Sequence, residues 1–275
     1  MARLVATLGM THRPTIYRNW DSAPEAAKNS ALESFGKLRK RLEESSPDCI
    51  VIIANDHIDQ FFLDNMPSFC VGITNRAQGP FPIEHEQGIP TYEGAVSEDL
   101  SRFMLKEGIR SNLDFARISD FRMDHAFVVP LSFMSPGGQI PIVPIFTNVL
   151  VPPIPSMQRF HFLGRVISKA IEQYRGHERV AVLGSINLSL DLAGPRHAKS
   201  DDEFDDLALN LMKAGTPEEF YDKMDLRRIF RAGNATAEFL NYLSLLGVVG
   251  DTKPELVECP RVPRWGTCPT VAWNV

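Results

Sequence analysis

Two short apolar runs in the first sixty residues are each followed closely by a histidine. The runs span residues 4–8 and 49–54, and the second is rich in valine and isoleucine. Apolar runs of this length, bounded by turn-forming or polar residues, predict buried strands. His12 and His57 follow these strands directly. Open α/β sheets form their sites at the carboxyl ends of parallel strands, so the pattern predicts a site that contains both histidines.

The segment between the two runs has the pattern of an amphipathic helix. Asp21 and Pro24 give it a start signal, and an apolar face of Leu32, Phe35, Leu38 and Leu42 continues to about residue 44. A strand, a helix and a second strand in this order predict a βαβ unit with two parallel strands. Both strand ends, with His12 and His57, then point in the same direction.

The remaining periodicity predicts further alternation of helices and strands. Helices are expected at 93–106, 156–174, 201–213, 216–222 and 234–246, and strands at 114–118, 140–146 and 180–183. Prolines within 140–146 favour an edge or bulged strand. Residues 60–87 fit either the wall and lid of a pocket or a packed surface hairpin. We therefore predict an α/β fold, a single domain over residues 1–275, with a central, mostly parallel or mixed sheet flanked by helices and a helical C-terminal third.

Composition narrows the classes of function. The chain has 275 residues, of which 44% are hydrophobic, and its formal net charge is −5, which gives no electrostatic case for binding nucleic acid or an anionic membrane. No segment has the apolar length of a membrane span, and the start of the chain lacks a secretory signal, so a cytoplasmic location is expected. The four cysteines are scattered without a CxxC pair and are expected to be reduced and mostly buried.

The candidate chemistry begins with the two strand-end histidines. A pair at such positions fits a metal site and a pair of hydrogen-bonded structural residues equally well. A third ligand is offered by Glu238, which follows Asn234, a candidate N-cap, in the first turns of a predicted helix. Spacing alone favours a solvent-exposed first-turn glutamate at this position over a metal ligand.

Five short motifs, taken in order, resemble those of the class III extradiol ring-cleavage dioxygenases. They are His12 shortly before Pro14, residues 54–57 followed by 62–67, Asp124-His125 before 129–131, Gly184-Ser185 after a strand, and residues 232–234 before Glu238. Each motif is short, but their order covers nearly the whole chain.

The resemblance implies that His12, His57 and Glu238 are the ligands of a non-haem Fe(II). Such a facial triad leaves one face of an octahedral ion open, where a catechol-like substrate and O2 bind. The same resemblance implies that His125 lies beside the substrate as an acid/base or hydrogen-bonding group. Asp56 is expected either to orient a ligand histidine or to cap the turn that follows it.

The chain departs from the family pattern after Ser185. The family has Gly-Gly-Leu/Met-Ser-His there, and its histidine serves as a base, whereas this chain has Leu190. Three explanations for Leu190 stay open. In the first, the substrate is one, such as an aminophenol, that needs less proton transfer by the protein, with His125 doing what remains. Otherwise His197 is a substitute base, or the chain is a non-catalytic paralogue that pairs with an active subunit. Because the three implied ligands are present, we favour an active Fe(II) dioxygenase. A zinc hydrolase with the same ligands is the remaining alternative, since two histidines and a glutamate also suit zinc.

The expected partners are a small aromatic substrate and O2, with no nucleic acid and no membrane. The chain is expected to form a homo-oligomer or to pair with a paralogous subunit. His85, His161 and His177 are expected to be surface or structural residues. Trp265, Cys268 and Trp273 are expected to serve mainly in packing, with a place in the pocket wall as the alternative.

Overall fold

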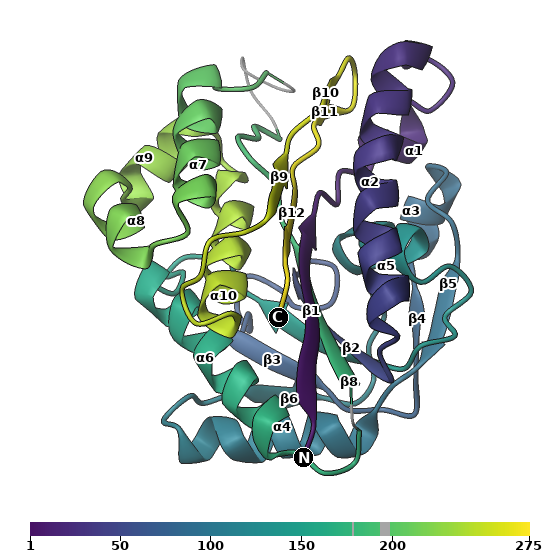
Figure 1. Ribbon diagram of the computed structural model, residues 1–275. Coiled ribbons are helices and arrows are strands. Elements are labelled where there is room, and N and C mark those ends of the chain that lie inside the picture. Colours follow the sequence, from purple (N-terminus) through teal and green to yellow (C-terminus); the bar gives the residue numbers. More distant parts are fainter. Residues whose placement is uncertain (178, 193–198) are drawn as a thin grey trace.

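Four parallel strands form the middle of an eight-stranded sheet in the computed structural model, which describes residues 1–177, 179–192 and 199–275. β1 (Arg3–Met10) and β2 (Cys49–Asn55) are joined by α2 (Glu25–Ser45), as predicted. β8 (Arg179–Ser185) lies between them and pairs with both, and β7 (Ile142–Thr147) pairs with the other side of β2. All three pairings are parallel, so the four carboxyl ends lie along one edge (Figure 1).

Shorter strands extend the sheet on both sides. β12 (Thr270–Trp273) runs antiparallel to β1 and carries β9 (Leu256–Glu258), while β3 (Phe69–Gly72) runs antiparallel to β7 and carries β6 (Ala116–Ile118). Two separate ribbons pair β4 (Arg76–Gly79) with β5 (Tyr92–Ala95), and β10 (Arg261–Val262) with β11 (Gly266–Thr267). The predicted α/β fold with a mixed sheet is confirmed.

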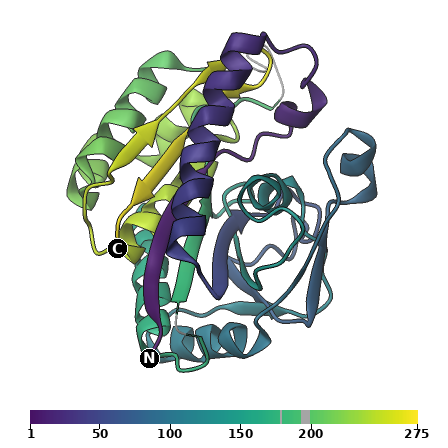
Figure 2. The same ribbon diagram turned by 45° about the vertical axis from the view of Figure 1, so that its right-hand side comes forward.

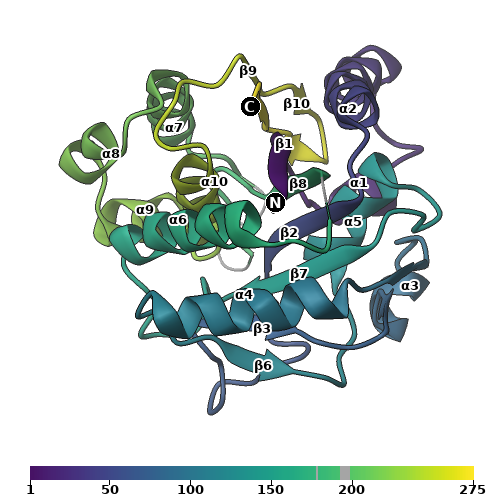
Figure 3. The ribbon, with the colours of Figure 1, turned by 60° about the horizontal axis from the view of Figure 1, so that its bottom comes forward.

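Helices cover both faces of the sheet, and each face has its own apolar cluster. One face is covered by α4 (Glu98–Arg110), α6 (Met157–Gln173) and α10 (Asn241–Val248), and the other by α2 and α5 (His125–Met134) (Figures 2 and 3). The remaining helices are α1 (Thr15–Arg18), α3 (Pro82–Glu86), α7 (Asp202–Ala214), α8 (Pro217–Lys223), α9 (Leu226–Ala232) and the 3-10 helix η1 (Thr236–Leu240). No helix of the described residues has the length and apolarity to cross a bilayer.

Several predicted elements need correction. The helix expected at 93–106 begins only at Glu98, because residues 92–95 pair with β4. The strand expected at a sheet edge is the interior strand β7. Its pairing with β3 begins at Ile145, so Pro144, which pairs with Ile52 of β2, lies just beyond that ladder. The segment 60–87 is a mixture of turns, two short strands and α3, and the described cysteines are free, three of them buried.

The C-terminal third is helical as predicted but differs in detail. The expected helices at 201–213 and 216–222 are present as α7 and α8, but the expected helix at 234–246 is divided into η1 and α10. The prediction omitted α9 and the strands β9 to β12. These strands are only two to four residues long, which is too short for an alternating pattern to identify them.

Two glycines let α6 and α10 approach closely. A Cβ built on Gly164 would lie 1.9 Å from the Ser244 carbonyl oxygen, and one on Gly247 would lie 2.1 Å from the His161 carbonyl oxygen. Both contacts are with backbone, so no side-chain movement could relieve them. This contact fixes the position of α10 and therefore of η1, which directly precedes it.

We predict that Gly164→Ala destabilises the protein by about 1–3 kcal/mol, because the added methyl group forces the two helices apart. Gly36→Ala in α2 is the matched control, since a Cβ there meets nothing within 4 Å and alanine favours a helix over glycine by up to about 1 kcal/mol. Urea unfolding of both variants, followed by circular dichroism, measures the difference. Equal unfolding midpoints for the two variants would contradict a tight α6–α10 contact.

Candidate functional site

Three polar side chains lie at equivalent positions past three neighbouring strands. His12, His57 and Asn187 each come two residues after the last residue of β1, β2 and β8, respectively. Because β8 lies between β1 and β2 and all run parallel, the strand ends bring the three side chains to the same place. All three contact one carboxylate, that of Glu238 in η1.

Glu238 is completely buried. Its Oε1 lies 3.0 Å from His57 Nε2, its Oε2 lies 3.1 Å from His12 Nε2, and Asn187 Nδ2 donates a hydrogen bond of 2.7 Å to Oε2. Burial by itself would raise the pKa of Glu238, but the two histidines hold it well below its usual range. No lysine or arginine of the described residues is within ion-pair distance, so this buried charge depends on histidines, an amide and whatever cation the site binds.

Hydrogen bonds at Nδ1 fix the orientation of both histidine rings. Ser185 Oγ donates to the Ala126 carbonyl at 2.6 Å, which leaves it to accept from His12 Nδ1 at 2.7 Å. Asp124 accepts from His57 Nδ1 at 3.0 Å and from the His57 backbone N–H at 2.9 Å. With a proton on each Nδ1, the Nε2 lone pair of both rings is directed toward Glu238. This Nδ1–H tautomer is the one that a histidine needs to bind a metal through Nε2.

His125 lies beside this cluster, at the start of α5. Its ring stacks on that of His57 with the centroids 4.0 Å apart, and its centroid is 5.8 Å from that of His12. Its Nδ1 and its backbone N–H both bond to Glu84 Oε1 of α3. Burial, assisted by His57, lowers the pKa of His125 well below its usual range, so its ring is neutral.

The donor set suits a metal ion. Two metal–ligand bonds of about 2.1 Å at right angles place their donor atoms about 3 Å apart, which matches the two separations between imidazole nitrogen and carboxylate oxygen. Ligand atoms of His12, His57 and His125 also lie within 4.8 Å of one another. The described residues thus offer a metal two histidines together with either Glu238 or His125.

Several smaller predictions have outcomes in the structure. Asp56 caps its own turn by accepting from the backbone N–H groups of residues 58, 60 and 61, and Asp124 instead holds the His57 ring. Asn234 is not an N-cap, because its side chain accepts from the Leu192 N–H and Ala235 precedes η1. The predicted structural histidines are hydrogen-bonded, His85 to Ile89, His161 to Asp251 and His177 to Ser97.

The backbone of Leu190 is hydrogen-bonded to the segment that carries Glu238. Its N–H donates to Thr236 Oγ1 at 3.1 Å, and its carbonyl accepts from the Ala235 N–H at 3.1 Å. Its side chain lines a cavity of about 460 Å³ together with Arg13 and Trp265, so Trp265 has a place in a cavity wall. His197, the other candidate base, lies outside the described residues.

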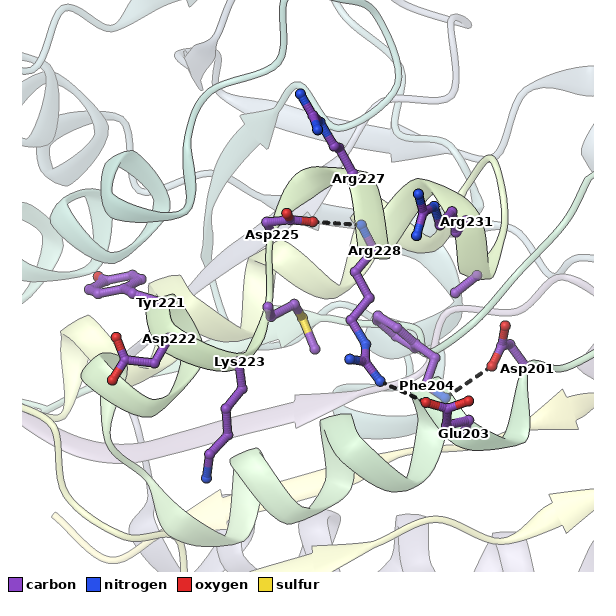
Figure 4. Close-up of a pocket in the computed structure, with 12 residues that line it drawn as sticks. Asp201, Glu203, Phe204, Tyr221, Asp222, Lys223, Asp225, Arg227, Arg228 and Arg231 are labelled. Carbon is purple, nitrogen blue, oxygen red and sulfur yellow. Dashed lines mark hydrogen bonds and ion pairs between the residues drawn. The ribbon is translucent and has the colours of Figure 1, made fainter.

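A larger cavity of about 730 Å³ lies among α7, α8 and α9, away from the histidines. Figure 4 shows that its lining is mainly charged, with Asp225 accepting from the Arg228 N–H and the Arg228 side chain paired with Glu203 at 3.1 Å. These groups partner one another or cap helices, so this cavity contributes nothing to the predicted chemistry.

Sequence reasoning missed Asn187 and Glu84. Asn187 occupies a position where the family pattern has glycine, and its place four residues after the predicted strand at 180–183 was the available signal. Glu84 gave no signal, because it reaches His125 from a short helix 41 residues away in the chain. Neither contact follows from local spacing.

Comparisons with known proteins place this chain beside aromatic ring-opening dioxygenases. The family model described as the catalytic LigB subunit of aromatic ring-opening dioxygenase matches residues 6–268. A 2,3-dihydroxyphenylpropionate/2,3-dihydroxicinnamic acid 1,2-dioxygenase of Klebsiella pneumoniae is 31% identical over 245 residues, which cover 89% of this chain and 74% of that protein. A similarly named enzyme of Pseudomonas putida is 33% identical over 76% of this chain and 64% of its own length. An uncharacterized protein of Escherichia coli K12 has a similar fold, with a TM-score of 0.56, 15% identity, and coverage of 98% of this chain and 99% of its own.

The hydrogen bond between Asp124 and His57 leads to a testable prediction. Asp124→Ala removes the acceptor that fixes the His57 tautomer, so we expect the affinity for a divalent metal to fall about 10–100-fold. Asp124 also caps α5, so the matched control is Asp225→Ala, which removes the cap of α9 and should leave metal affinity unchanged. Competition with a chromophoric chelator measures both. Equal affinities in the two variants would show that Asp124 acts only as a cap.

Proposed function

The chain belongs to the family of catalytic LigB subunits of aromatic ring-opening dioxygenases, and from that membership we propose that it is an Fe(II)-dependent enzyme that opens a hydroxylated aromatic ring with O2. The substrate class in this proposal is a catechol, an aminophenol or a related compound. The proposal includes a cytoplasmic enzyme that forms a homo-oligomer or pairs with a paralogous subunit. The observation that supports it most is the convergence of two correctly oriented imidazole Nε2 atoms on a buried carboxylate.

In this proposal His12, His57 and Glu238 hold the metal. Glu238 is preferred to His125 as the third ligand because its oxygens contact both Nε2 atoms and its negative charge offsets that of the cation. When bound there, Fe(II) supplies the open coordination positions and the electron path that O2 chemistry requires. Asn187 orients the Glu238 carboxylate through its hydrogen bond to Oε2.

His125 is the proton-transfer group of the proposal. Its Nδ1 is engaged by Glu84, so Nε2 of the neutral ring is free to accept a proton from a substrate hydroxyl. Glu84, within hydrogen-bonding distance, then stabilises the imidazolium that forms, as a carboxylate does for other catalytic histidines. Leu190 cannot move a proton, so His125 is the one histidine of the described residues that is left to do so.

The ligand assignment predicts different metal contents for two isosteric changes. Glu238→Gln removes the charge of the third ligand, and we expect it to lose at least about 90% of bound Fe(II) after anaerobic loading and desalting, with O2 uptake abolished. His125→Asn should retain the metal and lose activity. Metal analysis and an oxygen electrode give both readouts. Full metal content in Glu238→Gln, with loss in His125→Asn, would replace the assignment by a three-histidine site.

The family's base histidine gives a second prediction. If a substrate that needs less proton transfer explains Leu190, then Leu190→His should raise turnover of plain catechols by about 10-fold or more, within the range of a positioned base. Leu190→Gln is the control for size and polarity without a base. An oxygen-uptake assay over catechols and aminophenols compares the three proteins. Unchanged catechol turnover in Leu190→His would remove this explanation.

Leu190 also favours a second candidate, a non-catalytic paralogue that pairs with an active subunit. The two functions differ in one simple measurement. An isolated chain that binds Fe(II) stoichiometrically and consumes O2 with any member of a panel of catechols and aminophenols is an enzyme. A chain that binds the metal but consumes no O2 with the whole panel is the partner subunit.

A further inference from the structure

The cavity of about 460 Å³ beside Leu190 has a cationic end close to the predicted metal site. It lies between the loop that follows β1, residues 190–192, and the β10–β11 ribbon. Arg13, which directly follows the predicted ligand His12, forms part of its wall. His12, His57 and Glu238 are not among its described lining residues, but Arg13 directly follows His12 and the Leu190 N–H donates to Thr236 of η1, the helix that carries Glu238.

Arg13 is a buried guanidinium without an ionic partner. It is 6% exposed, and its Nε and Nη2 donate only to neutral acceptors, namely the Thr267 carbonyl at 3.0 Å, the Ser189 carbonyl at 2.8 Å and Thr267 Oγ1 at 3.2 Å. Within the described ranges, no carboxylate lies within ion-pair distance of it, and no hydrogen bond is made by Nη1. A buried charge is costly unless it is paired, so this arrangement points to an anion that is supplied from outside the chain.

The nearby acidic groups do not fill this role. Glu238 and Asp205 interact electrostatically with Arg13, but within the described part of the chain neither carboxylate is within ion-pair distance of it. Glu238 is committed to the two histidines, and Asp205 accepts from the Ser189 N–H at 2.8 Å and lies 3.8 Å from Arg261. In the metal-bound protein the cation would further offset the charge of Glu238, which leaves Arg13 less compensated.

The rest of the cavity suits an organic anion rather than a simple inorganic one. Arg18 and Arg264 are exposed lining residues with no ion pair to any described residue, and Asp191 is the single acidic residue among the described lining. The chain as a whole carries a net charge of −5, so the positive charge of this arginine cluster is opposite in sign to the net charge of the chain. Apolar side chains, including Trp265, Val262 and Leu190, form much of the remaining wall.

We propose that this cavity is a subsite for a carboxylate-bearing side chain of the aromatic substrate, with Arg13 binding the carboxylate and the apolar wall covering the carbon chain. The inference rests on the proposed ring-opening function for the identity of the ligand as substrate. Nη1, the Arg13 nitrogen that has no hydrogen bond to a described residue, can donate a charge-assisted hydrogen bond to the carboxylate, and Gly266 keeps the space beside it free, since a Cβ there would lie 3.0 Å from that atom. Arg18 and Arg264 attract the anion at the mouth.

Binding can be tested without ring opening. Phenylpropionate has no adjacent hydroxyl groups to chelate a metal, and phenylpropanamide is its neutral analogue. We expect the metal-loaded protein to bind the carboxylate at least about 10-fold more tightly than the amide in calorimetric titrations, with quenching of tryptophan fluorescence because Trp265 lines the cavity. Equal affinity for the two compounds would overturn the proposal.

Variants identify the residues responsible. Arg13→Gln should abolish the preference for the carboxylate, and the exposed double change Arg18→Gln with Arg264→Gln should reduce it about 2–5-fold without a risk to folding. Arg227→Gln, an exposed arginine in the cavity among α7, α8 and α9, is the control and should leave the preference unchanged. A preference that survives in both Arg13→Gln and the double variant would overturn the proposal, as would an equal loss in Arg227→Gln.

Turnover separates this subsite from the proposed function. 2,3-Dihydroxyphenylpropionate has a carboxylate on its side chain, and its methyl ester has a neutral ester group there. A lower KM for the acid, lost in Arg13→Gln, supports the subsite. If both compounds are opened with equal KM, the subsite is wrong while the ring-opening function stands. If neither of these compounds nor any other catechol or aminophenol tested is opened, but phenylpropionate still binds through Arg13, the anion site stands and the ring-opening function is wrong.

Discussion

A buried carboxylate that has no lysine or arginine partner among the residues the structure describes is the constraint on which the site depends. Glu238 is fully enclosed, and its stabilising contacts come from His12, His57 and Asn187, which are held at the ends of three strands far apart in the sequence. Such a charge is tolerated only where its neighbours are fixed. The parallel order of β2, β8 and β1 supplies that fixation, and the close packing of α6 on α10 holds the segment that carries Glu238.

Much of the central fold could be predicted because its signals are local. The runs that form β1, β2 and β8 are apolar and long enough to be identified, and the right-handed βαβ connection makes β1 and β2 parallel. The interior position of β7 could not be predicted, because the prolines within 140–146 favour an edge and only tertiary pairing shows that Pro144 lies just beyond the ladder with β3. The β9–β12 strands were missed for the same reason, since each is defined by its partner.

The sequence likewise predicted some residues of the candidate site and missed the contacts of others. The positions of His12 and His57 follow from the strand pattern, and Glu238 was reached only through family resemblance, because a glutamate in a first helical turn is ordinarily exposed. Asp124 and Glu84 act on histidines through contacts that cross 67 and 41 residues of chain. Spacing cannot identify such pairs. The choice between Asp56 and Asp124 as the partner of His57 illustrates this limit, since the adjacent residue is the more obvious candidate and caps a turn instead.

The stretch 186–190 contacts both the buried carboxylate of Glu238 and the buried guanidinium of Arg13. Asn187 supplies an amide to the buried carboxylate, Ser189 supplies a carbonyl to the buried guanidinium of Arg13, and Leu190 forms part of the cavity wall. A histidine at position 190 would place a second titratable cation near Arg13, whereas leucine leaves an apolar surface there. The loss of a base and the presence of an unpaired arginine are therefore consistent with one change in the site, from proton transfer at this wall toward recognition of a charged substrate.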